Sequence, residues 1–103
     1  MEKYSKLKNF WKNKKVFITG HTGFKGSWMC LMLNLLGAKI YGYSLKPHKK
    51  SLFIQSKSAQ FLKVNTYSNI NDEKKLYKSI NKIKPDILFH LAAQPLVRYS
   101  YLL

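Results

Sequence analysis

The chain has 103 residues, of which 46% are hydrophobic and 15% are aromatic. This composition excludes an intrinsically disordered chain and suits one small domain. Lys and Arg together number 19 against 4 Asp and Glu, which gives a formal net charge of +15 and fits a nucleic-acid or anionic-surface partner. The lysines, however, are spread from Lys3 to Lys84 without one long block. That spread favours a solvated basic surface and makes a nucleic-acid partner the weaker interpretation.

Targeting signals and disulfides are not visible in the sequence. Residues 1–10 lack the apolar core of a signal peptide, and the longest apolar run, around residues 28–36, is too short to span a bilayer. Cys30 is the only cysteine, so no disulfide can form within the chain, as is usual in a reducing compartment. We therefore expect a cytoplasmic protein without a membrane partner and without a metal site.

The amino-terminal part of the chain divides at the first strand. Residues 1–14 are polar and basic, and we expect a tail there, ahead of a folded domain at residues 15–103. Residues 15–19 predict a short strand. Because its apolar residues 16–18 do not alternate with polar ones, both faces of this strand are expected to be covered, as in a parallel sheet.

Three glycines spaced three apart follow this strand directly. Gly20 would let the backbone turn sharply, Gly23 would leave room for a pyrophosphate, and Gly26 would let the first helical turn pack closely. The start of the following helix would offer unpaired N–H groups and a positive dipole end to an anion. The spacing differs from the G-x-G-x-x-G fingerprint, but its place between a strand and a helix favours a phosphate-binding turn over one that binds nothing.

A helix is predicted over residues 25–36, and Gly37 is expected to end it. Its apolar residues recur at helical spacing and are expected to face the core. Cys30 is interpreted as a small buried side chain rather than a nucleophile. A second strand over residues 39–43 then completes a strand–helix–strand unit. The predicted core stripe of this helix consists of Trp28, Leu31, Met32, Leu35 and Leu36.

The end of the second strand lacks the acidic residue that usually holds the ribose 2′-hydroxyl of a dinucleotide. Tyr43, Ser44, Leu45 and Lys46 stand there instead. Ser44 could make one hydrogen bond to a ribose, whereas Lys46 could favour a 2′-phosphate. These residues therefore leave NAD and NADP both open.

The second half of the chain continues the alternation. Residues 47–58 form a loop with one helical turn, residues 61–66 predict a third strand, Asp72 is the expected N-cap of a helix that Pro85 ends, and residues 87–91 predict a fourth buried strand. This order predicts an α/β fold, the N-terminal half of a Rossmann-like, doubly wound parallel sheet with strand order 3-2-1-4. The carboxyl ends of strands one and four would then face one cofactor crevice.

Two motif blocks resemble the CDP-glucose 4,6-dehydratases, which belong to the extended short-chain dehydrogenase/reductase family. The blocks are residues 19–28 and residues 89–98, together with Ser100 and Tyr101. The resemblance runs from about residue 10 to the last residue. It implies an NAD-dependent lyase that removes water from the nucleotide sugar CDP-glucose to give CDP-4-dehydro-6-deoxyglucose, for lipopolysaccharide and other surface polysaccharides.

The resemblance also implies roles for individual residues. The pyrophosphate would lie on the glycine turn, Asn69 and Ile70 stand where the family usually has Asp-Ile beside the adenine, and residues 91–94 would run towards the nicotinamide. Arg98, Ser100 and Tyr101 would lie on the substrate side. The predicted cofactor-binding residues are Gly20, Thr22, Gly23, Phe24, Lys25, Gly26, Ser44, Asn69, Ile70, Leu91, Ala92, Ala93 and Gln94.

Three further side chains have a purely structural interpretation as well as a functional one. His21 is interpreted as a polar turn residue rather than a chemical group. His90, within an apolar strand, is expected to be a packed core histidine rather than a base. Lys25 is left open between a phosphate contact and a solvated surface charge.

The chemistry implied by the resemblance needs a Tyr-x-x-x-Lys pair, and the single match, Tyr4 to Lys8, precedes the first strand. We therefore expect the N-terminal, cofactor-binding part of such an enzyme, marginally stable and inactive alone, with the catalytic residues beyond Leu103. A homodimer is expected for the full-length enzyme. Two other classes stay open: a non-catalytic NAD(P)-binding module or half of a split enzyme, and a basic nucleic-acid-binding domain.

Overall fold

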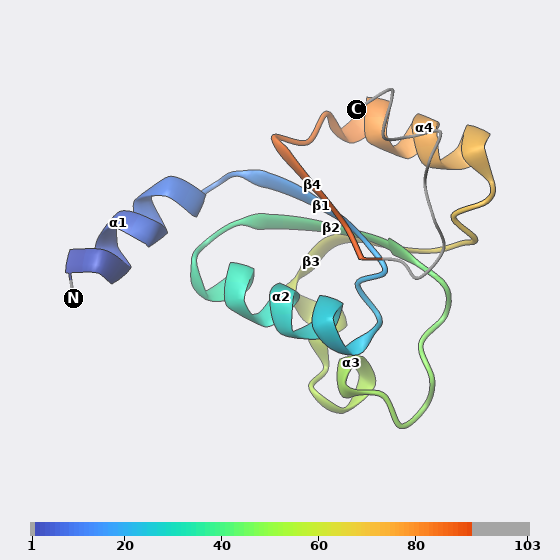
Figure 1. The fold of residues 1–103 in the computed structure, drawn as a ribbon, viewed down its shortest axis with the longest axis horizontal. Coiled ribbons are helices and arrows are strands. Elements are labelled where there is room, and N and C mark those ends of the chain that lie inside the picture. Colours follow the sequence, from blue (N-terminus) through green and yellow to red (C-terminus); the bar gives the residue numbers. More distant parts are fainter. Residues whose placement is uncertain (1, 92–103) are drawn as a thin grey trace.

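A four-stranded parallel sheet carries helices on both of its faces (Figure 1). The structure is a computed structural model that describes residues 2–91. Its elements in chain order are α1 (Glu2–Trp11), β1 (Lys15–Thr19), α2 (Phe24–Leu35), β2 (Lys39–Ser44), α3 (Leu52–Gln55), the 3-10 turn η1 (Ser58–Phe61), β3 (Leu62–Tyr67), α4 (Glu73–Ile83) and β4 (Ile87–His90).

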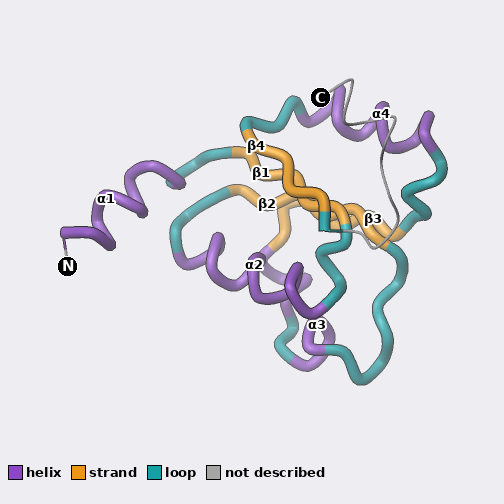
Figure 2. The backbone as a smooth tube through the Cα atoms, viewed as in Figure 1, coloured by secondary structure: helices purple, strands orange, loops and turns teal. Residues whose placement is uncertain are grey.

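The strands are arranged in the order β3-β2-β1-β4, and every pair is parallel (Figure 2). This confirms the predicted strand order of half a Rossmann-like sheet. Residues 16–18 of the central strand β1 are at most 1% exposed, as their unbroken apolar run predicted. Thr19 at the end of β1 lies opposite both Tyr43 of β2 and His90 of β4, so the carboxyl ends of these strands meet.

The two faces of the sheet carry separate parts of the core. Helices α2 and α3 lie on one face and α4 lies on the other (Figure 1). The cluster on the α2 face is formed by Val16, Ile18, Cys30, Leu33 and Ile40. The cluster on the α4 face is formed by Phe17, Tyr43, Ile70 and Leu76.

Helix α2 faces the sheet with a different side from the one predicted. Its buried residues are Gly26, Ser27, Cys30 and Leu33, whereas Trp28, Met32 and Leu35 of the predicted stripe are 50%, 55% and 67% exposed. The cause is steric, because the small side chains on the buried face of the helix allow its axis to approach the sheet closely. Cys30 is buried as predicted, and Gly37 ends the helix with a positive φ of 81°.

Two outer parts of the fold also differ from expectation. The segment expected as a basic tail contains helix α1, whose Trp11 packs against the cluster on the α2 face and whose Tyr4 hydroxyl donates to the Leu35 carbonyl at 3.3 Å. Strand β4, expected to be buried, is only half-buried and His90 is exposed. Within residues 2–91 it pairs with β1 alone, which leaves its other edge open.

The second half of the described chain follows the prediction closely. The Asp72 side chain caps α4 by accepting from the Lys75 N–H at 3.2 Å, and Lys84 adopts a φ of 52° just before Pro85. The helical turn expected in the loop after β2 is α3, capped by Ser51. No helix within the described residues is long and apolar enough to cross a membrane.

Candidate nucleotide-binding site

The turn after β1 begins with a backbone conformation that favours glycine. Gly20 has a φ of +79°, in the left-handed region that other residues rarely adopt. Its N–H donates to the Tyr43 carbonyl at 3.0 Å, and its own carbonyl accepts from the Gly23 N–H at 3.2 Å. The turn is therefore tight and is joined to the end of β2.

Gly26 and Gly23 differ in what surrounds them. A Cβ at Gly26 would overlap the Gly20 carbonyl oxygen and lie 2.5 Å from the Cα of His21, so Gly26 is required by packing within the chain. A Cβ at Gly23 would lie 3.5 Å from the nearest atom, the Gly20 oxygen, which is ordinary contact. Packing within the described chain therefore leaves room for a side chain at Gly23, the position predicted to face a pyrophosphate.

Helix α2 starts at this turn without a side-chain cap on its first N–H groups. The Ser27 N–H and hydroxyl both return to the Gly23 carbonyl, at 2.9 and 2.7 Å. In a regular helix, the backbone N–H groups of the first turn have no hydrogen-bond partner within the helix. Phe24 and Lys25, which belong to this turn of α2, are exposed. An uncapped helix start is suited to an anion, and Lys25 is exposed beside it.

A hydroxyl pair joins the turn to the end of β2. Thr22 Oγ1 donates to the Leu45 carbonyl at 3.1 Å and lies 2.8 Å from Ser44 Oγ. With its one hydrogen directed at Leu45, Thr22 accepts from Ser44. Ser44 Oγ then keeps lone pairs with which it can accept from a ligand hydroxyl, so the two predicted residues lie together.

His21 has a setting that the sequence analysis did not anticipate. Its side chain is 0% exposed, and its Nε2–H donates to Asn65 Oδ1 on β3 at 2.6 Å. Burial lowers the pKa of His21 below its ordinary value of 6.5, opposed in part by hydrogen bonding to Asn65 and the backbone of Tyr43. His21 is thus a residue of the turn, as interpreted, but its ring is buried.

The ring of His21 crosses β2 at Gly42. A Cβ at Gly42 would lie 2.5–2.6 Å from three atoms of the ring. Phe53 of α3 packs edge-on against the ring at 5.2 Å between centroids, and Tyr67 of β3 stacks parallel to it at 6.5 Å. Sequence reasoning missed Asn65, Phe53 and Tyr67, and the one available signal was a glycine within a strand, which often marks a close approach.

The carboxyl ends of the other strands complete this edge of the sheet. The Leu91 N–H donates to the Thr19 carbonyl at 2.8 Å, which places Leu91 beside the turn as expected. His90 Nδ1 lies 2.6 Å from Thr19 Oγ1. His90 is exposed, so its interpretation as a packed core residue is wrong, because its strand lies at an edge of the described sheet.

The residues predicted beside the adenine lie at the end of β3. The Ser68 N–H donates to the Ser44 carbonyl at 2.8 Å, which holds this segment against the end of β2. Asn69 is exposed, and its Oδ1 accepts from the Asn71 N–H at 2.9 Å. Ile70 is 6% exposed and packs in the core on the α4 face, so its side chain supports the fold.

Six predicted site residues lie outside the described part of the chain. They are Ala92, Ala93, Gln94, Arg98, Ser100 and Tyr101.

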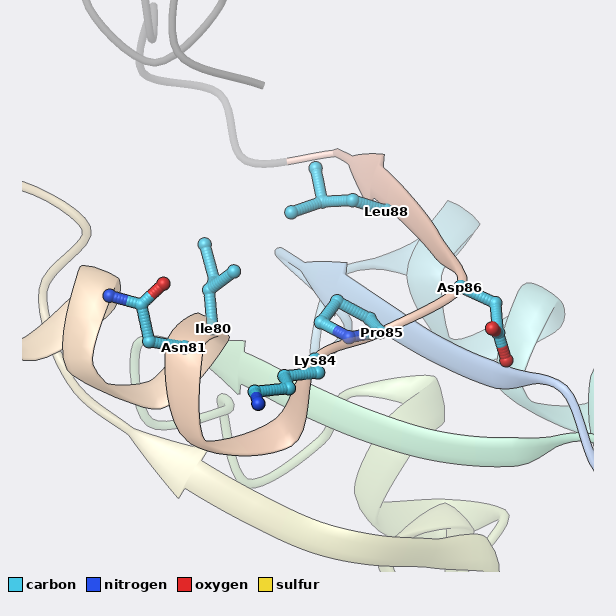
Figure 3. A pocket seen from close by; sticks show the side chains of 6 residues that line it. All are labelled: Ile80, Asn81, Lys84, Pro85, Asp86 and Leu88. Atoms are coloured by element: carbon cyan, nitrogen blue, oxygen red, sulfur yellow. The ribbon is translucent and has the colours of Figure 1, made fainter.

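A hollow of about 540 Å³ lies at a different place, where α4 leads into β4 (Figure 3). Ile80 and Leu88 line it on two sides, and Pro85 lies below Leu88 in the view of Figure 3. Asp86 accepts from the Lys15 N–H at 2.8 Å. The hollow is at the amino end of β4, whereas the glycine turn lies at the carboxyl ends of the strands, and none of the predicted site residues within residues 2–91 lines it.

The parallel β1–α2–β2 unit, the left-handed Gly20 and the uncapped start of α2 are features of a Rossmann-type fold. The comparison with known families names the group more closely. The sequence matches the family described as GDP-mannose 4,6 dehydratase over residues 17–102, and the chain belongs to this family.

The relatives are sugar-nucleotide 4,6-dehydratases. The chain is 52% identical over 95 residues to the CDP-glucose 4,6-dehydratase of Salmonella typhimurium, covering 91% of this chain and 26% of the relative. It is 28% identical over 113 residues to GDP-mannose 4,6 dehydratase 2 of Caenorhabditis elegans, covering 98% of this chain and 28% of the relative. The chain thus spans about a quarter of the length of these relatives.

A solved structure supports the fold. A candidate epimerase from Burkholderia cenocepacia superimposes with a TM-score of 0.64 at 22% identity, over 88% of this chain and 29% of that one. At this identity the likeness concerns the fold alone.

Proposed function

We propose that this chain forms the NAD-binding part of a CDP-glucose 4,6-dehydratase, a lyase acting on a nucleotide sugar. The observation that carries the proposal is the contrast between Gly26 and Gly23. Packing within the described chain requires a glycine at residue 26 and leaves room for a side chain at residue 23. A bound pyrophosphate would explain the second glycine. The 52% identity to the Salmonella enzyme supports the choice of substrate.

In this proposal the residues of the turn hold the phosphates. The N–H groups at the start of α2 would donate to the pyrophosphate, Ser44 would accept from a ribose hydroxyl, and Asn69 would lie beside the adenine. Ala92, Ala93 and Gln94 would continue towards the nicotinamide, with Arg98, Ser100 and Tyr101 on the substrate side. When bound, NAD would take a hydride from the sugar and return it after water has left.

The end of β2 supports NAD over NADP in this proposal. Ser44 Oγ could accept from a ribose hydroxyl, which favours the unphosphorylated ribose of NAD, whereas Lys46 lies two residues further and is exposed. The single Tyr-x-x-x-Lys match, Tyr4 to Lys8, falls within α1. We therefore propose that these 103 residues bind the cofactor without carrying out the dehydration. For the complete enzyme we propose a cytoplasmic homodimer.

Isothermal titration of the chain with NAD, and separately with NADP, tests this function. We expect NAD to bind, and Gly23→Ala to weaken binding about tenfold or more because its methyl group would occupy the phosphate position. Asn81→Ala, an exposed change on α4, is the control and should bind NAD like the unmodified chain. Absence of binding to the unmodified chain, or equal binding by Gly23→Ala, would contradict the proposal.

A further inference from the structure

The imidazole of His21 links the phosphate-binding turn to two strands and a helix. The residue itself belongs to the turn, between Gly20 and Thr22. Its ring passes over Gly42 of β2, bonds to Asn65 of β3 and packs against Phe53 of α3. One side chain of the turn thus contacts three separate elements.

The backbone of His21 is fixed from the opposite direction. Its Cα would be 2.5 Å from a Cβ at Gly26, so it lies directly against the first turn of α2. The Ser27 hydroxyl lies 3.5 Å from the His21 carbonyl. The main-chain atoms of His21 therefore lie next to the N–H groups at the start of α2.

The chemistry of the ring indicates a directional role rather than packing alone. His21 is 0% exposed, and no group within residues 2–91 makes a well-directed hydrogen bond to its Nδ1. A phenylalanine would fill a similar space without burying a nitrogen, and burial of a polar atom without a well-directed hydrogen bond is unfavourable. What the imidazole adds is the bond from Nε2 to Asn65, which Asn65 extends by donating to the Tyr67 hydroxyl at 3.1 Å.

We propose that His21 is a positioning residue for the nucleotide cofactor. Through its bond to Asn65 across Gly42, it holds residues 20–26 in the shape that presents the N–H groups of α2 to the pyrophosphate. Phosphate binding by backbone donors requires their positions to be held to within about 0.5 Å, and the two ring contacts restrict the remaining freedom. This inference rests on the proposed NAD-binding function.

Titration with NAD tests the role of the bond through four variants of the full 103-residue chain. His21→Phe keeps a ring and removes the bond, and Asn65→Leu removes its acceptor. We expect each to weaken NAD binding about tenfold. Asn65→Asp keeps an acceptor for Nε2–H and should bind within about twofold of the unmodified chain. Leu76→Val shortens a buried side chain in the opposite cluster and should leave the dissociation constant unchanged.

Amide hydrogen exchange tests the same role without a ligand. We expect faster exchange at the amides of residues 22–27 in His21→Phe and Asn65→Leu, but not in Leu76→Val. Unchanged exchange and unchanged NAD binding in His21→Phe would overturn the proposal, as would an equal loss in Leu76→Val. If the unmodified chain binds no NAD, the proposed function fails, and the exchange rates alone then decide whether His21 holds the turn.

Discussion

The carbonyl oxygen of Gly20 occupies the space into which a side chain at Gly26 would project. These two residues lie at opposite ends of the turn, one leaving β1 and the other within the first turn of α2. Their contact sets how closely the helix approaches the strand. It also sets the rotation of α2 about its own axis, because only the face that carries Gly26 can lie against the turn.

Exchange of each glycine for alanine separates packing from ligand binding. Gly26→Ala should lower the free energy of unfolding by about 1–3 kcal/mol, since the added methyl collides with backbone atoms that cannot move aside. Gly23→Ala should change it by no more than about 0.5 kcal/mol, because its Cβ meets only an ordinary contact. Urea unfolding followed by circular dichroism measures both values. Equal losses in the two variants would contradict this account of the turn.

The order of the sheet was predictable from the sequence for a simple reason. Short apolar strands such as residues 15–19 alternate with helices, and right-handed connections between parallel strands leave few arrangements. Caps such as Asp72 and end residues such as Gly37 are local signals that do not depend on distant contacts. These elements therefore appear in the structure close to their predicted bounds.

The orientation of side chains was less predictable, because it depends on contacts between distant residues. Hydrophobic spacing alone favoured Trp28 and Met32 as core residues of α2, but the contact between Gly20 and Gly26 rotates that face outwards. The setting of His21 depends on how β2 and β3 lie beside the turn. No local pattern connects His21 with Asn65, 44 residues away.

Two leucines of α2 test this rotation directly. Leu33 is 4% exposed and Leu35 is 67% exposed. Leu33→Ala should therefore cost about 2–5 kcal/mol through the cavity it leaves, whereas Leu35→Ala should stay within about 0.5 kcal/mol of the unmodified chain. Thermal or urea unfolding of the pair gives the comparison. A larger loss for Leu35→Ala would support the face first predicted from hydrophobic spacing.

Gly42 and His21 should behave as a coupled pair. Gly42→Ala places a methyl group within 2.6 Å of three ring atoms, so it should destabilise the chain when His21 is present. In the His21→Ala background the space is free, and the same change should cost much less. We expect a coupling free energy of about 0.5–3 kcal/mol from the double-mutant cycle. Additive effects would show that the ring does not occupy this space.

Cys30 should be chemically inert in the folded chain. It is 0% exposed, and burial raises the pKa of its thiol to about 12, so the reactive thiolate is scarce at neutral and mildly alkaline pH. Labelling with iodoacetamide, measured by mass spectrometry, should be slow without denaturant and complete in concentrated guanidinium chloride. Rapid labelling of the folded chain would contradict the burial of Cys30.

The stability of the fold should depend on pH through His21. Burial lowers the pKa of its imidazole in the folded chain, opposed in part by hydrogen bonding to Asn65 and the backbone of Tyr43. In the unfolded chain the imidazole takes up a proton near its ordinary value of 6.5, so the unfolded state binds more protons below that pH. The stabilisation is therefore complete above pH 6.5 and is lost as the pH falls through the lowered, folded-state value.

Urea unfolding between neutral pH and about pH 5 measures this effect. We expect the free energy of unfolding to fall more steeply with decreasing pH in the unmodified chain than in His21→Phe, which cannot take up the proton. His48 and His90 are present in both proteins, so their contributions cancel in the comparison. Parallel curves for the two proteins would mean that His21 does not gain a proton on unfolding, and that the buried ring is not the origin of the pH dependence.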